Sequence, residues 1–70
     1  MKTMRLTVLF DREEDGRWIA QVPQLPGVLV YGDTREAALR RAKALALETI
    51  AGLAELGEAD IDDAIHFDAA

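Results

Sequence analysis

The chain has 70 residues, a formal net charge of −5 and no cysteine. This length fits one domain, and the absence of cysteine excludes disulfides, thiolate metal sites and cysteine nucleophiles. Half of the residues are apolar, which argues against disorder, but no run resembles a signal peptide or a membrane span. We therefore expect a cytoplasmic protein without membrane contact. A small domain without staples often completes its core by self-association, so we also expect a homo-oligomer.

The first half of the chain predicts three strands. Residues Met4 to Phe10 alternate between apolar and polar side chains, which is typical of a half-buried strand. Asp15-Gly16 is a strong turn signal, and Trp18 to Val22 resumes the alternation. The proline-bounded corner 23–27 ends this second strand, and Val28 to Tyr31 forms a third. Short connections between adjacent strands predict an antiparallel meander.

The second half predicts a long helix and then a fourth strand. Either Asp33 or Thr34 can cap a helix that runs from Arg35 to Leu56, and Gly57 is placed to end it. One apolar stripe follows helical spacing along it: Ala38, Leu39, Ala42, Leu45, Ala46, Thr49, Ile50 and Leu53. Residues 64–67 predict a last strand, which pairs with an edge of the sheet. The predicted fold is α+β, in the order β-β-β-α-β, with an antiparallel three- to four-stranded sheet and one long helix packed on one face.

The charges are unevenly distributed along the chain. The first 43 residues hold eight basic and six acidic residues, a net +2, whereas the last 27 hold seven acidic residues and no lysine or arginine. Asp62 and Asp63 belong to this acidic end. Such an end repels phosphate and favours a basic partner.

Few residues are suited to catalysis. His66 is the single histidine, and the chain has no serine or cysteine that it could activate. The acidic pairs are adjacent in sequence, so they do not converge easily on one metal ion. We therefore expect no catalytic residue, no cofactor and no metal site. The basic residues of the helix, Arg35, Arg40, Arg41 and Lys43, have no aromatic residue interleaved with them, so we expect no platform for stacking nucleic-acid bases.

Protein binding is the better hypothesis. Trp18 and Tyr31 are large amphipathic aromatic residues of the kind that anchor interfaces. Leu25 and Pro26 lie on a rigid corner, where we expect Leu25 to be an exposed apex that loses little entropy on binding. The candidate interface residues are Trp18, Leu25, Pro26, Tyr31, Asp62 and Asp63.

The same segments resemble a known family. The resemblance rests on Asp15-Gly16, Trp18-Ile19-Ala20, the V-P-Q-L-P-G corner at 22–27, Tyr31-Gly32-Asp33-Thr34 and Glu36-Ala37-Ala38. In this order and spacing they are similar to the HicB-like antitoxin domain, and the similarity covers about Leu6 to Gly57.

The resemblance implies a β-β-β-α-β fold, a partial ribonuclease H-like fold without its active site. It also implies a partner, a small basic HicA-type toxin that cleaves messenger RNA, and assembly into dimers or tetramers. We expect one HicB-like domain over residues 1–70, without the C-terminal DNA-binding domain that many such antitoxins carry, so DNA binding is not expected. The alternative is an orphan HicB-like regulatory domain with another partner, such as nucleic acid, and a nuclease relic ranks third.

Overall fold

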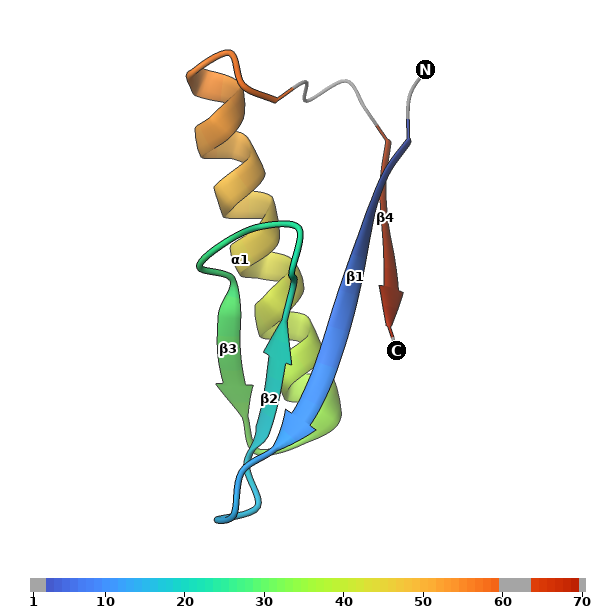
Figure 1. The fold of residues 1–70 in the computed structure, drawn as a ribbon, viewed down its shortest axis with the longest axis vertical. Coiled ribbons are helices and arrows are strands. Elements are labelled where there is room, and N and C mark those ends of the chain that lie inside the picture. Colours follow the sequence, from blue (N-terminus) through green and yellow to red (C-terminus); the bar gives the residue numbers. More distant parts are fainter. Residues whose placement is uncertain (1–2, 60–63, 70) are drawn as a thin grey trace.

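The computed structural model describes residues 3–59 and 64–69. It contains four strands and one helix (Figure 1): β1 Thr3–Arg12, β2 Trp18–Gln21, β3 Leu29–Gly32, α1 Arg35–Glu55 and β4 Ala64–Ala69. This confirms the predicted order β-β-β-α-β, including the fourth strand. The α1 helix packs on one face of the sheet and leaves the other face uncovered (Figure 1).

The sheet is mixed, and the prediction of an antiparallel sheet is wrong for its last strand. The strand order is β3-β2-β1-β4, in which β1 pairs antiparallel with β2 but parallel with β4. The two hairpin connections reverse the chain twice, so β3 runs in the same direction as β1. Since α1 then carries the chain back along the sheet, β4 enters from the end where β1 begins. A strand-helix-strand crossover gives parallel strands for this reason.

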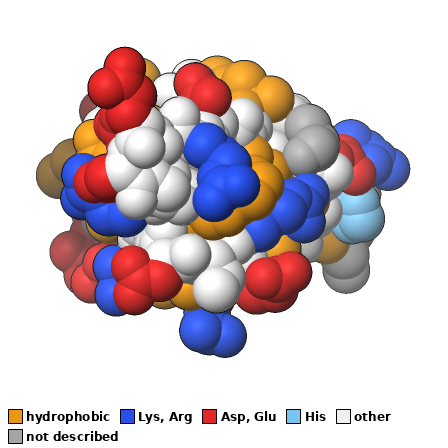
Figure 2. Space-filling model, turned by 90° about the horizontal axis from the view of Figure 1, so that it is seen from below, with side chains coloured by type: hydrophobic (Ala, Val, Ile, Leu, Met, Phe, Trp, Pro, Cys, Tyr) orange, Lys and Arg blue, Asp and Glu red, His pale blue; other side chains and the backbone are white. Residues whose placement is uncertain are grey.

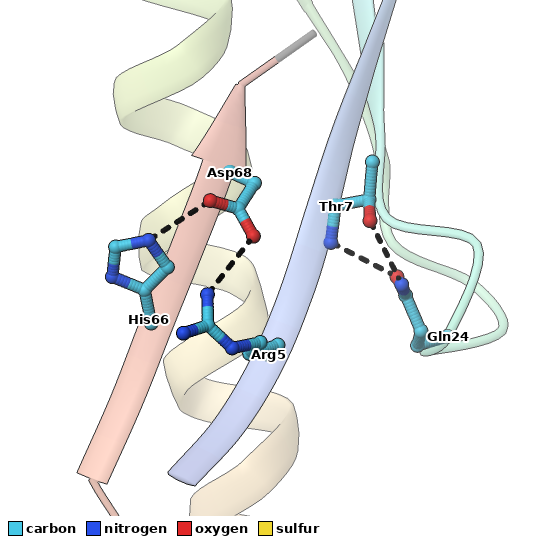
Figure 3. Close-up of polar contacts among 5 residues, drawn as sticks. All are labelled: Arg5, Thr7, Gln24, His66 and Asp68. Atoms are coloured by element: carbon cyan, nitrogen blue, oxygen red, sulfur yellow. Dashed lines mark hydrogen bonds and ion pairs between the residues drawn. The ribbon is translucent and has the colours of Figure 1, made fainter.

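The long strand β1 has a different partner along each half. Its residues 9–12 pair with β2, whereas residues 3–8 pair with β4 on the other side. Where β2 has ended, the Gln24 side chain takes its place against β1 (Figure 3). The Thr7 backbone N–H donates to Gln24 Oε1 at 3.2 Å, and Gln24 Nε2 donates to Thr7 Oγ1 at 3.1 Å. One side chain thereby continues the ladder and fastens the 23–27 corner to β1.

Small side chains of α1 let the helix lie close to the sheet. The predicted stripe is confirmed, because Ala38, Ala42, Ala46 and Ile50 are its fully buried members. Near the N-terminal end of α1, the helix backbone lies directly against Gly32 at the end of β3. A Cβ built on Gly32 would lie 2.4 Å from the Ala38 backbone nitrogen and 2.9 Å from its Cα. Only glycine fits at position 32 without moving the helix.

Both ends of α1 are capped by the local sequence. Of the two predicted N-caps, Thr34 is the residue found: its backbone is extended, and its hydroxyl accepts from the Ala37 N–H at 3.0 Å. The capping box that Asp33 would have formed with Glu36 is therefore not the one used. Gly57 has a φ of +76°, and its N–H donates to the Ala54 carbonyl, which confirms the predicted left-handed stop.

Within the ranges 3–59 and 64–69, no helix combines the length and the apolar character that crossing a bilayer requires.

Candidate protein-binding surface

The face of the sheet opposite α1 carries apolar side chains that the helix does not cover. Strand alternation places Leu9, Ile19, Leu29 and Tyr31 there, and we call these four residues the outer-face patch. Three of them are exposed: Leu9 by 38%, Leu29 by 47% and Tyr31 by 38%. They adjoin because Ile19 is opposite Tyr31 in the ladder, and Gln21 is opposite both Leu9 and Leu29.

The outer-face patch includes an open hollow of about 490 Å³, lined by Leu9, Phe10, Asp11, Ile19, Gln21 and Leu29. Its polar groups are the Asp11 carboxylate and the Gln21 amide. The Asp11 carboxylate accepts from the Arg12 N–H at 2.8 Å and stays exposed. An apolar floor with an accessible carboxylate suits a side chain that has a long aliphatic stem and a positive end, such as lysine or arginine.

Arg17 closes one border of the patch over Tyr31. Its guanidinium lies 4.7 Å from the centroid of the Tyr31 ring, while its Nε donates to Asp15 Oδ2 at 2.8 Å. The Arg17 backbone N–H also donates to Asp15, and this hydrogen bond, joined by the guanidinium contact, lowers the pKa of the Asp15 carboxyl below its ordinary 3.8. The Asp15-Gly16 turn thus orients the cation that covers Tyr31.

Arginine and aromatic side chains alternate at the end of the molecule where α1 begins. Trp18 meets Phe10 edge-on at 6.3 Å, Arg12 lies 4.8 Å from the Trp18 ring, and Arg35 lies 4.1 Å from the Phe10 ring. No aromatic residue lies among the basic residues of the helix itself, but Arg35 meets the Phe10 ring of β1. These aromatic residues belong to β1 and β2 rather than to the helix, so their proximity to Arg35 cannot be recognised from the order of residues in the sequence.

Acidic residues outnumber the arginines at this end. Seen from this end, acidic side chains are spread among the basic ones (Figure 2). The hairpin turn and the start of α1 contribute six carboxylates against three arginines: Asp11, Glu13, Glu14, Asp15, Asp33 and Glu36 against Arg12, Arg17 and Arg35. Because like charges repel, this excess disfavours a nucleic-acid backbone and favours a basic surface.

The structure separates the predicted interface residues. Trp18 lies on the helix side of β2, whereas Tyr31 lies on the outer face of β3, so the two aromatic residues are not parts of one surface. Pro26 is exposed in the 23–27 corner, remote in the ladder from Tyr31.

The expectation that Leu25 is an exposed apex is wrong, because its exposed fraction is only 8%. The Leu25 N–H donates to the Val22 carbonyl, and the Leu25 carbonyl accepts from the Val28 N–H. These two turns fold the corner inward and place the leucine in the core. The remaining candidates, Asp62 and Asp63, lie outside the described residues.

Sequence reasoning missed Leu9, Ile19 and Leu29 as surface candidates. A signal was present, because each of the first three strands carries an apolar residue on the face that alternation leaves for solvent. Such residues become informative only when they adjoin, and adjacency depends on the register between strands.

His66 on β4 lies beside Asp68, which also faces Arg5 of β1 (Figure 3). Its Nε2 lies 2.9 Å from Asp68 Oδ1, and Asp68 Oδ2 lies 3.6 Å from the Arg5 guanidinium. All three side chains are more than half exposed, which is the ordinary setting of a surface ion pair that links two strands. No group of three metal-ligating side chains occurs in segments 3–59 and 64–69.

A UPF0150 protein of Thermoplasma acidophilum is 42% identical to this chain over 36 residues. The match covers 51% of this chain and 52% of that relative, so the chain spans about half the length of the curated protein it matches. Neither a protein-family model nor a solved structure gives a significant match. The comparison supports, at most, a partial relation to the family of HicB-like antitoxin domains.

Proposed function

We propose that this chain is the antitoxin-like binding module of a type II toxin-antitoxin system, which neutralises a small basic HicA-type toxin by covering it. The observation that carries the proposal is the outer-face patch, an exposed apolar surface with the Asp11 carboxylate in its hollow. Contiguous exposed apolar residues mark interaction sites, and the acidic surroundings select a basic partner. The partial similarity to a UPF0150 protein points toward the same class.

In this proposal the chain acts by occlusion and performs no chemistry of its own. The exposed His66–Asp68 pair lies on β4, away from the hollow, and the sequence supplies no serine or cysteine for it to activate. Neutralisation then depends on the affinity for the toxin. Purified chain that cleaves RNA would contradict this part of the proposal.

The test is binding to the small basic protein encoded next to this chain, measured by titration calorimetry, together with rescue of growth when both are expressed. Leu9→Lys should weaken binding at least tenfold, about 1.4 kcal/mol, and abolish rescue, because it places a cation beside the incoming basic surface. Leu47→Lys is the matched control, since Leu47 is similarly exposed, by 47%, but lies on α1. Equal affinity of the two variants for the basic protein would show that the outer-face patch is not the binding surface. If the neighbouring protein does not bind the unmodified chain, the proposed function is wrong.

The alternative is a regulatory domain that binds nucleic acid, and the stacked arginines Arg12 and Arg35 are what favour it. A gel shift by the isolated chain that weakens steeply with salt would support this alternative. The excess of carboxylates around these arginines leads us to expect no shift.

A further inference from the structure

The outer face of the sheet already holds one arginine of the chain itself, and the surroundings of that arginine show what this surface offers to such a side chain. Arg17 places its guanidinium 4.7 Å from the centroid of the Tyr31 ring, and its Nε donates to Asp15 Oδ2 at 2.8 Å. An aromatic surface and a carboxylate are therefore combined within reach of one guanidinium. This combination suits arginine, whose planar head stacks on such a surface while its N–H groups donate to an acceptor.

The adjoining hollow offers similar parts. Asp11 is opposite Ile19 in the ladder and Ile19 is opposite Tyr31, so the hollow borders the surface that Arg17 covers. The Asp11 carboxylate accepts from the Arg12 N–H through Oδ1 at 2.8 Å, which leaves Oδ2 without a donor among the described residues. The apolar lining of the hollow is formed by Leu9, Ile19 and Leu29.

The Asp11 carboxylate has no counter-charge in the described part of the chain. No cation in residues 3–59 and 64–69 lies within ion-pair distance of Asp11, whereas Asp15 and Asp68 each have one. The neighbouring Arg12 is engaged on the other face of the sheet, where its guanidinium lies 4.8 Å from the Trp18 ring. Asp11 is therefore available to a cation from another molecule.

We propose that the hollow is a subsite for one arginine side chain, which, resting on the function proposed above, the basic toxin supplies. The aliphatic stem would lie over Ile19, and the guanidinium would donate to Asp11 Oδ2. Gln21 also lines the hollow and is diagonal to Asp11 in the ladder, so its amide oxygen is a second acceptor for the same guanidinium. A lysine ammonium is more strongly hydrated and has no planar face to pack on the lining, so arginine is the better occupant.

N-acetylarginine amide, in which the side chain carries the single charge, tests the subsite without any partner protein. In heteronuclear NMR it should shift the backbone amides of Ile19 and Gln21, and N-acetyllysine amide should bind more weakly. Asp11→Asn should weaken the binding of the arginine probe about three- to fivefold, and the new amide can still accept from the Arg12 N–H. Glu14→Gln is the matched control, since it removes the same charge from the same end of the molecule but lies outside the hollow, and it should change the binding far less.

Gln21→Glu is the complementary variant. It adds a second carboxylate to the lining at an exposed position, so it should tighten the binding of the arginine probe about threefold, a gain that damage to the fold would not produce. Three results would each overturn the proposal: an arginine probe that leaves the amides of Ile19 and Gln21 unshifted, equal weakening by Asp11→Asn and Glu14→Gln, or equal binding of the lysine probe.

Titration calorimetry with the neighbouring basic protein separates the subsite from the proposed function. Asp11→Asn should weaken that complex at least about tenfold, because a charge pair enclosed in an interface loses more than an exposed one. If the basic protein binds Asp11→Asn as tightly as the unmodified chain, the function stands and the subsite is wrong. If the basic protein does not bind while the arginine probe still depends on Asp11, the subsite stands and the proposed function is wrong.

Discussion

Gly32→Ala adds one methyl group where the end of β3 lies directly against the first turn of α1. The new Cβ would lie 2.4 Å from the Ala38 nitrogen, 2.9 Å from the Ala38 Cα and 3.0 Å from the Ala37 carbonyl carbon. All three atoms belong to the helix backbone, so no side chain can rotate out of the way. The first turns of α1 must move away from the sheet instead, although Ala38 and Ala42 are fully buried against it.

The cost is set by this displacement. Overpacking a core by a methyl group typically costs about 1–3 kcal/mol, and contact with immobile backbone places this site at the upper end or above it. A domain of this length has a total stability of about 4–10 kcal/mol. We expect Gly32→Ala to lower the free energy of unfolding by about 3 kcal/mol or more, enough to leave a measurable unfolded population.

Urea unfolding, followed by Trp18 fluorescence and by far-ultraviolet circular dichroism, measures this change. Two other glycines serve as matched controls. Gly52 lies on the exposed side of α1 with nothing within 4 Å, so Gly52→Ala should stabilise the helix by about 1 kcal/mol. Gly27 also has open space around it but a φ of +92°, so Gly27→Ala should cost about 1–2 kcal/mol through backbone strain alone.

The order of the three variants separates the causes. If Gly32→Ala were no more harmful than Gly27→Ala, the close approach of β3 and α1 would not be what requires glycine at position 32.

Further predictions concern the cap, the turn and the corner. Thr34→Ala should lower the free energy of unfolding by about 1 kcal/mol in the same urea assay, because Thr34 is the N-cap of α1. Asp33→Ala should lower it clearly less, and equal losses would contradict this assignment. The lowered pKa of Asp15 means that its ionised form is favoured in the folded state, so its stabilising contribution is present above about pH 3.8 and is lost as the pH falls through the folded pKa. An NMR titration of the Asp15 carboxyl checks this, and Arg17→Ala, which keeps the backbone N–H, should return the pKa only part of the way; a full return would mean that the side chain alone is responsible. Leu25→Ala should cost about 2–5 kcal/mol as a core deletion, and a loss below about 1 kcal/mol would indicate that the leucine is exposed after all.

Local patterns predicted the elements well because each was encoded by neighbours in the sequence. Alternation located β1 to β3, helical spacing located the buried alanines, and Gly57 ended α1 as expected. The direction of β4 was wrong because antiparallel pairing was extended from the hairpins to a strand that follows a helix. The topology of the crossover, rather than any residue in 64–69, makes that strand parallel.

The candidate surface was less accessible from the sequence. Leu25 was expected to be exposed because prolines flank it, yet two backbone hydrogen bonds turn it into the core. Trp18 and Tyr31 were considered together as aromatic residues, but they lie on opposite faces of the sheet. Both errors concern the direction of a side chain relative to distant strands, which residue type alone does not specify.

The division of β1 between two partners also constrains when the domain can form. The hairpin of β1 and β2 closes over a few residues, but the pairing of Thr3 with Ala64 joins the two ends of the chain. Contacts of such wide sequence separation are slow to form, and a nascent chain cannot make them before β4 leaves the ribosome. Until then the first half of β1, with Leu6 and Val8 among its apolar residues, has an unpaired edge open to other chains. The pairing of β4 therefore covers this edge of β1 and ends the period in which aggregation through it is easiest.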